Sequence, residues 1–138
     1  MEAKDLMQFD WICLEDDPTP RQVDFIRSGE VGLYWNKIVT PPYIKPISLT
    51  PEILEKNGFE KMLDEDDTKY YCYYSRANDG YIKISLYNGG DGDWNINIIN
   101  YKKFDDNAIV YNNNFIFLKV HQLQHALRLC EITKEIEL

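Results

Sequence analysis

The sequence lacks the cysteine pattern of a disulfide framework or of a cysteine-based metal site. Its 138 residues include three widely spaced cysteines, Cys13, Cys72 and Cys130, and no Cys-x-x-Cys pair. An odd number of isolated cysteines argues against structural disulfides and against a zinc site built on thiolates. We therefore expect a reducing compartment, which favours the cytoplasm.

Long apolar runs are also absent. No stretch of the sequence approaches the roughly 20 apolar residues that a helix needs to cross a bilayer. The first ten residues, MEAKDLMQFD, lack the apolar centre of a signal peptide. We expect no membrane partner.

Clusters of lysine and arginine are missing as well. The net charge is −8 at pH 7, and no basic run interrupts the acidic balance. The average field of such a protein repels a phosphate backbone, which disfavours nucleic acid as a partner. A nucleic-acid-binding module stays open as an alternative, through Trp11, Arg21 and Arg27 in the N-terminal part.

The residues that are present are typical of one compact globule. Hydrophobic residues make up 44% of the chain and aromatic residues 14%, and a chain of this length can fold without cross-links. The pattern predicts an α+β fold. Residues 1–45 form a small N-terminal β unit, barrel-like or a meander. Residues 46–138 form a short capped helix, an antiparallel β-meander and a C-terminal helix packed on one sheet face.

Local signals place these elements along the chain. Residues 9–15, 21–27 and 31–36 alternate apolar and polar side chains, as short strands do, and the proline-rich residues 37–46 are expected to form an extended connector. Thr50 and Pro51 have the residue types of a helix start, and Gly58 that of a helix end, which predicts a helix over residues 51–57.

The meander is predicted from tyrosine- and isoleucine-rich segments that follow the charged turn at residues 64–67. The three asparagines at 112–114 are typical of a hairpin turn between two further strands. One sheet face, with Ile82, Ile84 and Leu86, is apolar, and we expect the two helices to cover it.

The opposite, polar sheet face is the candidate binding site. We assign to it Tyr71, Tyr73, Tyr81, Lys83 and Tyr87. Tyrosine gives a large contact area at a low cost in conformational entropy, so an exposed face of this kind suits a protein partner. The alternative is that the N-terminal β unit packs on this face and covers it.

The two histidines lie four residues apart in VHQLQHALRLCEI, residues 120–132. A helix over residues 120–131 places Leu123, Leu127 and Cys130 on the buried side. The other side holds His121, Gln124, His125 and Arg128. The string HQLQH lacks the glutamate that a His-Glu-x-x-His metal site uses as a general base. We prefer a solvent-side or interface polar stripe without a cofactor; a metal site at His121 and His125 is the alternative.

Other candidate sites are weaker. The glycine-rich loop with Asp91 and Asp93 has Ile96 where an EF-hand loop needs glycine, so calcium binding is not expected. No serine lies in a Gly-x-Ser-x-Gly context. We assign no catalytic residue.

Three segments, AKDL (3–6), KPISLTPEILEKNGFEK (45–61) and KVHQLQ (119–124), resemble a family of short uncharacterised proteins of phages and prophages in gut anaerobic bacteria. The family has a Pro-Ile-x-Leu-Thr box ending in Gly-Phe, and a Val-His-Gln-Leu-Gln box before a helical tail. The resemblance implies expression inside a bacterial host and brings no catalytic residue. It also suggests that Gln122 and Gln124 have structural roles, as partners of strand ends or loops.

The favoured hypothesis is a non-catalytic phage accessory protein that binds an unidentified protein partner in the host cytoplasm, for anti-defence or host takeover. A small metal-dependent hydrolase centred on His121 and His125 is an alternative from another class. A nucleic-acid-binding module is the third. The sequence leaves the oligomeric state open.

Overall fold

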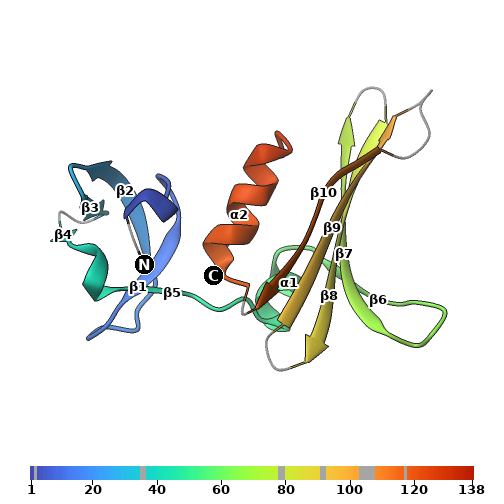
Figure 1. Ribbon diagram of the computed structural model, residues 1–138, viewed down its shortest axis with the longest axis horizontal. Helices are drawn as coiled ribbons and strands as arrows, with labels where there is room; N and C mark the ends of the chain where they lie inside the picture. Colours follow the sequence, from blue (N-terminus) through green and yellow to red (C-terminus); the bar gives the residue numbers. More distant parts are fainter. Residues whose placement is uncertain (2, 35–36, 78–79, 91–92, 103–107, 117) are drawn as a thin grey trace. The chain divides into compact units, whose positions relative to one another are not determined.

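The computed structural model describes residues 1, 3–34, 37–77, 80–90, 93–102, 108–116 and 118–138. It is an α+β protein with two antiparallel sheets and, among the described residues, two α-helices (Figure 1). The chain forms two compact units. The first unit comprises residues 1–48, 119–136 and 138, and the second comprises residues 49–118 and 137. The last helix thus groups with the N-terminal strands, whereas we expected a division after residue 45.

The sheet of the first unit has five short strands in the order β4-β3-β2-β1-β5. Their bounds are β1 (Trp11–Leu14), β2 (Arg21–Arg27), β3 (Glu30–Leu33), β4 (Lys37–Val39) and β5 (Ile44–Pro46). The expected connector at residues 37–46 therefore contains two strands, with the one-turn 3-10 helix η2 (Pro41–Tyr43) between them. Pro46 is compatible with a strand because β5 lies at the sheet edge, where the missing N–H need not pair.

The core of the first unit follows from alternation along these strands. Ile12 and Leu14 of β1 are buried, while Trp11 and Cys13, which point to the other face, are partly exposed. The buried cluster that they join consists of Leu6, Ile12, Leu14, Val23, Val31, Leu33 and Ile44. A second 3-10 turn, η1 (Ala3–Asp5), precedes this sheet.

The C-terminal helix α2 (Val120–Leu129) completes the first unit and contacts β1. Its start is tied to the end of the N-terminal segment, because Val120 N donates to Ile47 O at 2.9 Å. The Gln122 side chain caps the helix by accepting from Lys119 N at 2.9 Å, which confirms the structural role expected for this glutamine.

The second unit begins with helix α1 (Pro51–Lys56), and its predicted ends are confirmed. Thr50 Oγ1 accepts a hydrogen bond from Ile53 N at 3.4 Å, and Pro51 occupies the first helical position. Gly58 has a φ of +81°, the left-handed conformation that ends a helix at low cost for glycine. Phe59 N then donates to Leu54 O, and both side chains are buried.

Five strands form the sheet of the second unit, in the order β10-β9-β8-β7-β6. Their bounds are β6 (Glu60–Leu63), β7 (Lys69–Ala77), β8 (Gly80–Gly90), β9 (Asp93–Lys102) and β10 (Ala108–Ile116). Every strand pairs antiparallel with its neighbour in sequence, which confirms the meander. The charged turn before β7 is organised by Asp64, whose Oδ1 accepts from the backbone N–H groups of Asp66 and Thr68.

The expected hairpin turn at residues 112–114 is wrong. The three asparagines lie inside β10, where they pair with Asn97, Ile96 and Asn95 of β9. A continuous backbone ladder along β9 outweighs the turn preference of asparagine, because strand propensity depends strongly on the neighbouring strand.

Candidate functional site

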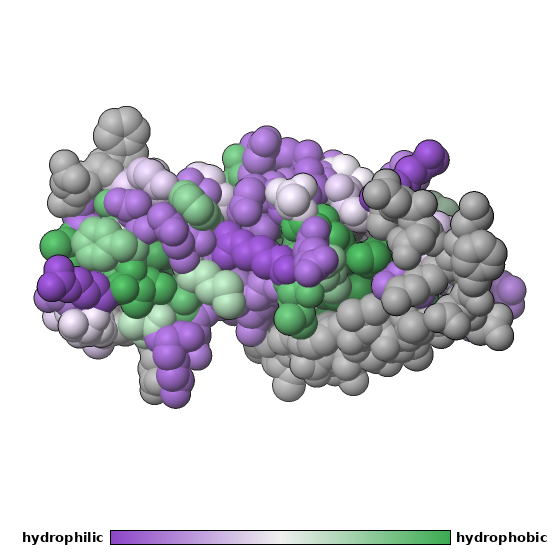
Figure 2. Space-filling model, turned by 90° about the horizontal axis from the view of Figure 1, so that it is seen from above, coloured by the Kyte–Doolittle hydropathy of each residue, from purple (hydrophilic) through white to green (hydrophobic). Residues whose placement is uncertain are grey.

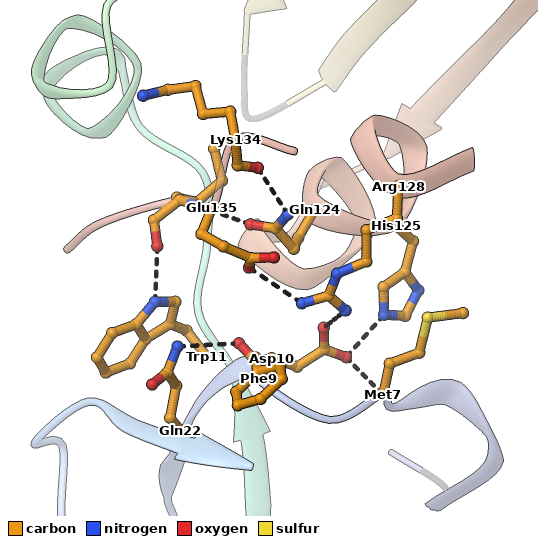
Figure 3. A network of polar contacts seen from close by, with 11 residues as sticks. Met7, Phe9, Asp10, Trp11, Gln22, Gln124, His125, Arg128, Lys134 and Glu135 are labelled. Atoms are coloured by element: carbon orange, nitrogen blue, oxygen red, sulfur yellow. Dashed lines mark hydrogen bonds and ion pairs between the residues drawn. The ribbon is translucent and has the colours of Figure 1, made fainter. Parts of the chain in front are cut away.

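A buried carboxylate organises the polar contacts of the first unit. Asp10, the residue before β1, is 0% exposed. Its Oδ2 accepts from Met7 N at 2.7 Å and lies 2.7 Å from His125 Nε2. Its Oδ1 lies 3.1 Å from Arg128 Nη1 (Figure 3). The side chains of Asp10, His125 and Arg128 thus form one charged cluster between β1 and α2.

An unusual backbone conformation directs Asp10 inward. Phe9 has a φ of +70°, in the left-handed region that a bulky side chain rarely adopts. The conformation is held on both sides of the residue. Phe9 N donates to Val23 O at 2.7 Å, and Gln22 Nε2 donates to Phe9 O at 3.3 Å. The Phe9 ring is 40% exposed while the next side chain, Asp10, is fully buried.

His121 is buried, so the solvent-side form of the predicted polar stripe is wrong at this residue. Its side chain is 6% exposed, its Nδ1 has no hydrogen-bond partner among the described residues, and its ring lies edge-on to that of His125 at 5.6 Å. Burial lowers the pKa of His121 to about 4, an effect that the Asp10 carboxylate opposes only in part. The His121 imidazole is therefore neutral at pH 7.

The C-terminal residues explain why Gln124 of α2 is buried. Gln124 Nε2 donates to Lys134 O at 3.0 Å, and Ile136 N donates to Gln124 Oε1 at 2.6 Å. Trp11 Nε1 donates to Ile136 O at 2.7 Å, so the same tail is also tied to β1 (Figure 3). Gln124 is 2% exposed, which confirms a structural role for it and corrects its expected position on the solvent side.

The arrangement of the histidines gives no support to a metal site. Among the described residues, no group of three or more His, Cys, Asp or Glu side chains could hold a metal ion. His125 Nε2 is already paired with Asp10, and Arg128 places a positive charge on the same carboxylate. A cation would have to displace both contacts, so the geometry favours a structural role for the pair.

The cysteines also lack the features of a nucleophile. Cys13 Sγ donates to Lys45 O at 3.5 Å, and burial raises the pKa of the Cys130 thiol. A thiol with a raised pKa forms little of the reactive thiolate at pH 7. Cys130 is only partly buried, at the C-cap of α2, rather than in the core as expected. In the glycine-rich loop, for which calcium binding is not expected, Asp91 lies outside the described residues.

The second unit has a sheet face rich in tyrosines, but its residues differ from the predicted ones. The pairing of β7, β8 and β9 places on one face the set Tyr70, Tyr74, Arg76, Tyr81, Lys83, Tyr87 and Tyr101. We call this set the tyrosine face. Three of the five predicted residues, Tyr81, Lys83 and Tyr87, belong to it.

Tyr71 and Tyr73 lie on the opposite, apolar face. Tyr71 pairs with Leu86 and is 5% exposed, with its ring 6.3 Å from that of Trp94. Tyr73 packs its ring 5.2 Å from that of Phe59. Their assignment to the binding face was wrong because alternation groups residues within one strand, whereas the register between strands decides which groups share a face.

The rings of the tyrosine face are paired across the strands. Tyr70 stacks on Tyr87 at 4.8 Å between centroids, and Tyr81 stacks on Tyr101 at 4.6 Å. Tyr74 tilts against Tyr81 at 5.7 Å. The face is accessible, since Tyr74 is 48% and Tyr81 39% exposed.

Lys83 lies between the two stacked pairs. Its Nζ is 5.7 Å from the ring centroid of Tyr70 and 5.9 Å from that of Tyr74. Burial acts to lower the pKa of Lys83, but Cys72 and Tyr74 outweigh it, so the pKa is raised. The pKa of Tyr74 is also raised, mainly by its hydrogen bond with Cys72, and burial raises that of Tyr87. At neutral pH these tyrosines are protonated and the lysine is charged.

The residues of the nucleic-acid alternative do not form a free basic surface. Arg21 Nη2 pairs with Asp17 Oδ2 at 2.8 Å, and the indole N–H of Trp11 is bonded to Ile136 O. Arg27 is exposed at the end of β2. One guanidinium is therefore neutralised and the indole donor is in use.

Comparisons with known proteins gave no match to a family model, a curated protein or a solved structure. Among the described residues, neither helix has the length and apolar character needed to cross a membrane.

Proposed function

We propose that the protein is a non-catalytic binding module that recognises a protein partner through the tyrosine face. The observation that carries the proposal is the cross-strand pairing of half-buried and exposed tyrosines around Lys83. Tyrosine is enriched in protein interfaces because one end of the side chain is apolar and the other can form hydrogen bonds.

The pairing of the rings favours a protein over a nucleic acid as the partner. Tyr70 and Tyr87 use their ring faces on each other, as do Tyr81 and Tyr101. Bases of single-stranded nucleic acids bind by stacking on free ring faces, whereas protein partners also use ring edges and hydroxyl groups. The net charge of −8 acts in the same direction.

Pairing also prepares the surface for binding. Each stacked tyrosine has few conformations left to lose when a partner docks, so less of the contact energy is spent on ordering side chains. Lys83 adds one fixed positive charge, which suits a carboxylate of the partner at the centre of the interface.

The biological setting that we propose rests on the resemblance carried by residues 3–6, 45–61 and 119–124. In this proposal the protein is an accessory protein of a phage or prophage and acts in the cytoplasm of its bacterial host. The three isolated cysteines, which the structure leaves free, are compatible with a reducing compartment.

The test is affinity capture from a lysate of a gut anaerobic bacterium, with the wild-type chain and a Tyr74→Ser, Tyr81→Ser double variant as baits. A protein recovered by the wild type is purified, and its affinity for each bait is measured by calorimetry. We expect the double variant to bind at least about tenfold more weakly, a loss of about 1.4 kcal/mol.

The matched control is Tyr43→Ser, because Tyr43 is an exposed tyrosine of the first unit, at 60%. It should bind the partner as the wild type does. Equal affinity of the wild type and the double variant for every recovered protein would exclude the tyrosine face as the binding site.

A further inference from the structure

A cavity of about 410 Å³ opens on the first unit. It is lined by Trp11, Thr19, Pro20, Arg21, Gln22 and Tyr34. Its volume lies in the range of ligand-binding clefts. Apolar side chains (green) are visible among hydrophilic ones on the surface of the first unit in Figure 2. The exposed aromatic residues of this unit include Phe9 and Tyr34.

The aromatic walls of this cavity are held in place. The Trp11 ring is fixed by the hydrogen bond from its Nε1 to Ile136 O at 2.7 Å. Tyr34 is 39% exposed, and its ring stacks on that of Phe9 at 6.3 Å with 21° between the planes. Phe9 presents its ring from the left-handed backbone conformation described above. Strained residues of this kind gather at binding sites, where the surroundings hold them.

A hydrogen-bond donor without an acceptor lies beside these rings. Arg21 Nη2 is paired with Asp17 Oδ2, but Arg21 Nε is buried and has no partner among the described residues. Because Asp17 already balances the charge of the guanidinium, the acceptor that fits Nε–H is a neutral carbonyl oxygen rather than a second carboxylate.

The charged residues near the cavity indicate which charge a bound ligand should carry. The loop that supplies Thr19 and Pro20 begins with three consecutive acidic residues, Glu15, Asp16 and Asp17. Asp17 is paired with Arg21, and Glu15 lies 3.9 Å from Lys45, so the exposed Asp16 carries the negative charge of this loop that no ion pair among the described residues balances. Only Arg21 among the lining residues is basic. A ligand that lies along this loop therefore gains by carrying positive charge.

We propose that this cavity binds an extended, proline-containing peptide segment of a partner protein with an arginine or lysine next to the proline. The proline packs between Trp11 and Tyr34, a peptide carbonyl accepts from Arg21 Nε, and the basic side chain lies along the acidic loop. Aromatic grooves bind such segments well because a polyproline helix is already extended and loses little entropy on binding. The site is independent of the tyrosine face.

The test uses three fluorescein-labelled synthetic peptides of about ten residues, the length of a typical recognition motif. The first contains a Pro-x-x-Pro core flanked by arginines. The second has glutamates in place of the arginines, and the third has alanines in place of the prolines. Fluorescence anisotropy with the full chain should show binding of the first peptide and at least about tenfold weaker binding of the other two.

Two single tyrosine variants test whether the peptide binds in the cavity. The two tyrosines that they replace are equally exposed in the wild type. Tyr34 and Tyr81 are both 39% exposed, the first beside the cavity and the second on the tyrosine face. Tyr34→Ser should weaken binding of the arginine-proline peptide at least about tenfold, and Tyr81→Ser should leave it unchanged. The opposite pattern is expected for the partner of the tyrosine face, so the two proposals fail separately.

A measurement on the wild-type chain tests the site without depending on whether the variants fold. In ¹H–¹⁵N spectra, the signals of Arg21 Nε–H and Trp11 Nε1–H should shift when the arginine-proline peptide is added. The proposal is overturned if this peptide does not bind at about 1 mM. It is also overturned if Tyr34→Ser binds like the wild type, or if the shifts occur in the second unit alone.

Discussion

Asp10 and His125 lie 115 positions apart in the sequence, yet Oδ2 of the first is 2.7 Å from Nε2 of the second. This pair joins the residue that precedes β1 to the middle of α2. The Asp10 carboxylate is completely buried, and the contacts that balance its charge come from His125, Arg128 and the backbone of Met7.

Replacing Asp10 should strongly destabilise the first unit. Asp10→Ala removes the acceptor of three donors and leaves Arg128 and His125 facing each other without an anion. Breaking one side of a buried ion pair costs about 3–5 kcal/mol. Urea unfolding measures the loss, and Asp16→Ala, at an exposed aspartate, should stay within about 0.5 kcal/mol of the wild type. Similar midpoints for the two variants would contradict the assignment of Asp10 as the centre of the cluster.

The neutral His121 ring should make the protein sensitive to mild acid. The unfolded chain binds a proton at His121 near pH 6.5, whereas the folded chain does so only near pH 4. Because the folded pKa is depressed, the stability from His121 is complete above pH 6.5 and is lost as the pH falls toward 4. Between pH 7 and pH 5 the loss amounts to about 2 kcal/mol.

The comparison for this prediction is His121→Leu, which keeps an apolar side chain in the same place and removes the titrating group. Urea unfolding at pH 7 and at pH 5 gives the change in unfolding free energy for each protein. The wild type should lose about 2 kcal/mol more than the variant. Equal losses would mean that His121 is protonated in the folded protein at pH 5.

Two leucines near the end of α2 should behave differently. Leu127 is 0% exposed and Leu129 is 69% exposed. Leu127→Ala should reduce the free energy of unfolding by about 2–5 kcal/mol because it leaves a cavity. Leu129→Ala should change it by no more than about 0.5 kcal/mol. Thermal unfolding of both variants compares them directly, and a larger loss for Leu129→Ala would reverse the orientation of the helix.

The cap of α1 should contribute measurably to the second unit. Thr50→Ala removes the side-chain oxygen that accepts from Ile53 N, and losses of this kind typically cost about 1 kcal/mol. Thr133→Ala is a suitable control, because Thr133 is exposed in the C-terminal tail. If both substitutions have the same effect on the urea midpoint, the Thr50 contact adds nothing to stability.

The features that could be predicted from the sequence are those with local causes. The ends of α1 depend on Thr50, Pro51 and Gly58, which lie next to the backbone groups that they satisfy, and all three predictions are confirmed. The α+β order of elements could be read in the same way, because alternation and helical spacing are properties of short segments.

The features that could not be predicted depend on partners far away in the sequence. His121 and Gln124 were placed on the side of α2 opposite its apolar face, but both are buried. His121 lies against the His125 ring, and the C-terminal tail contacts Gln124 through Ile136 N. No pattern in the sequence predicts the contact between Asp10 and His125. The membership of the tyrosine face depended on the register of β7 against β8, which alternation within each strand leaves open.

The first unit is built from two separate segments, residues 1–48 and 119–136. It can therefore be completed only late in synthesis. A ribosome makes the N-terminal strands first, but Asp10 stays without His125 and Arg128 until the last helix has been made. The second unit, apart from residue 137, lies in one continuous stretch and can fold while synthesis continues, because domains generally fold as units during translation. Nascent chains stopped before residue 119 should therefore contain a protease-resistant second unit and a protease-sensitive first one.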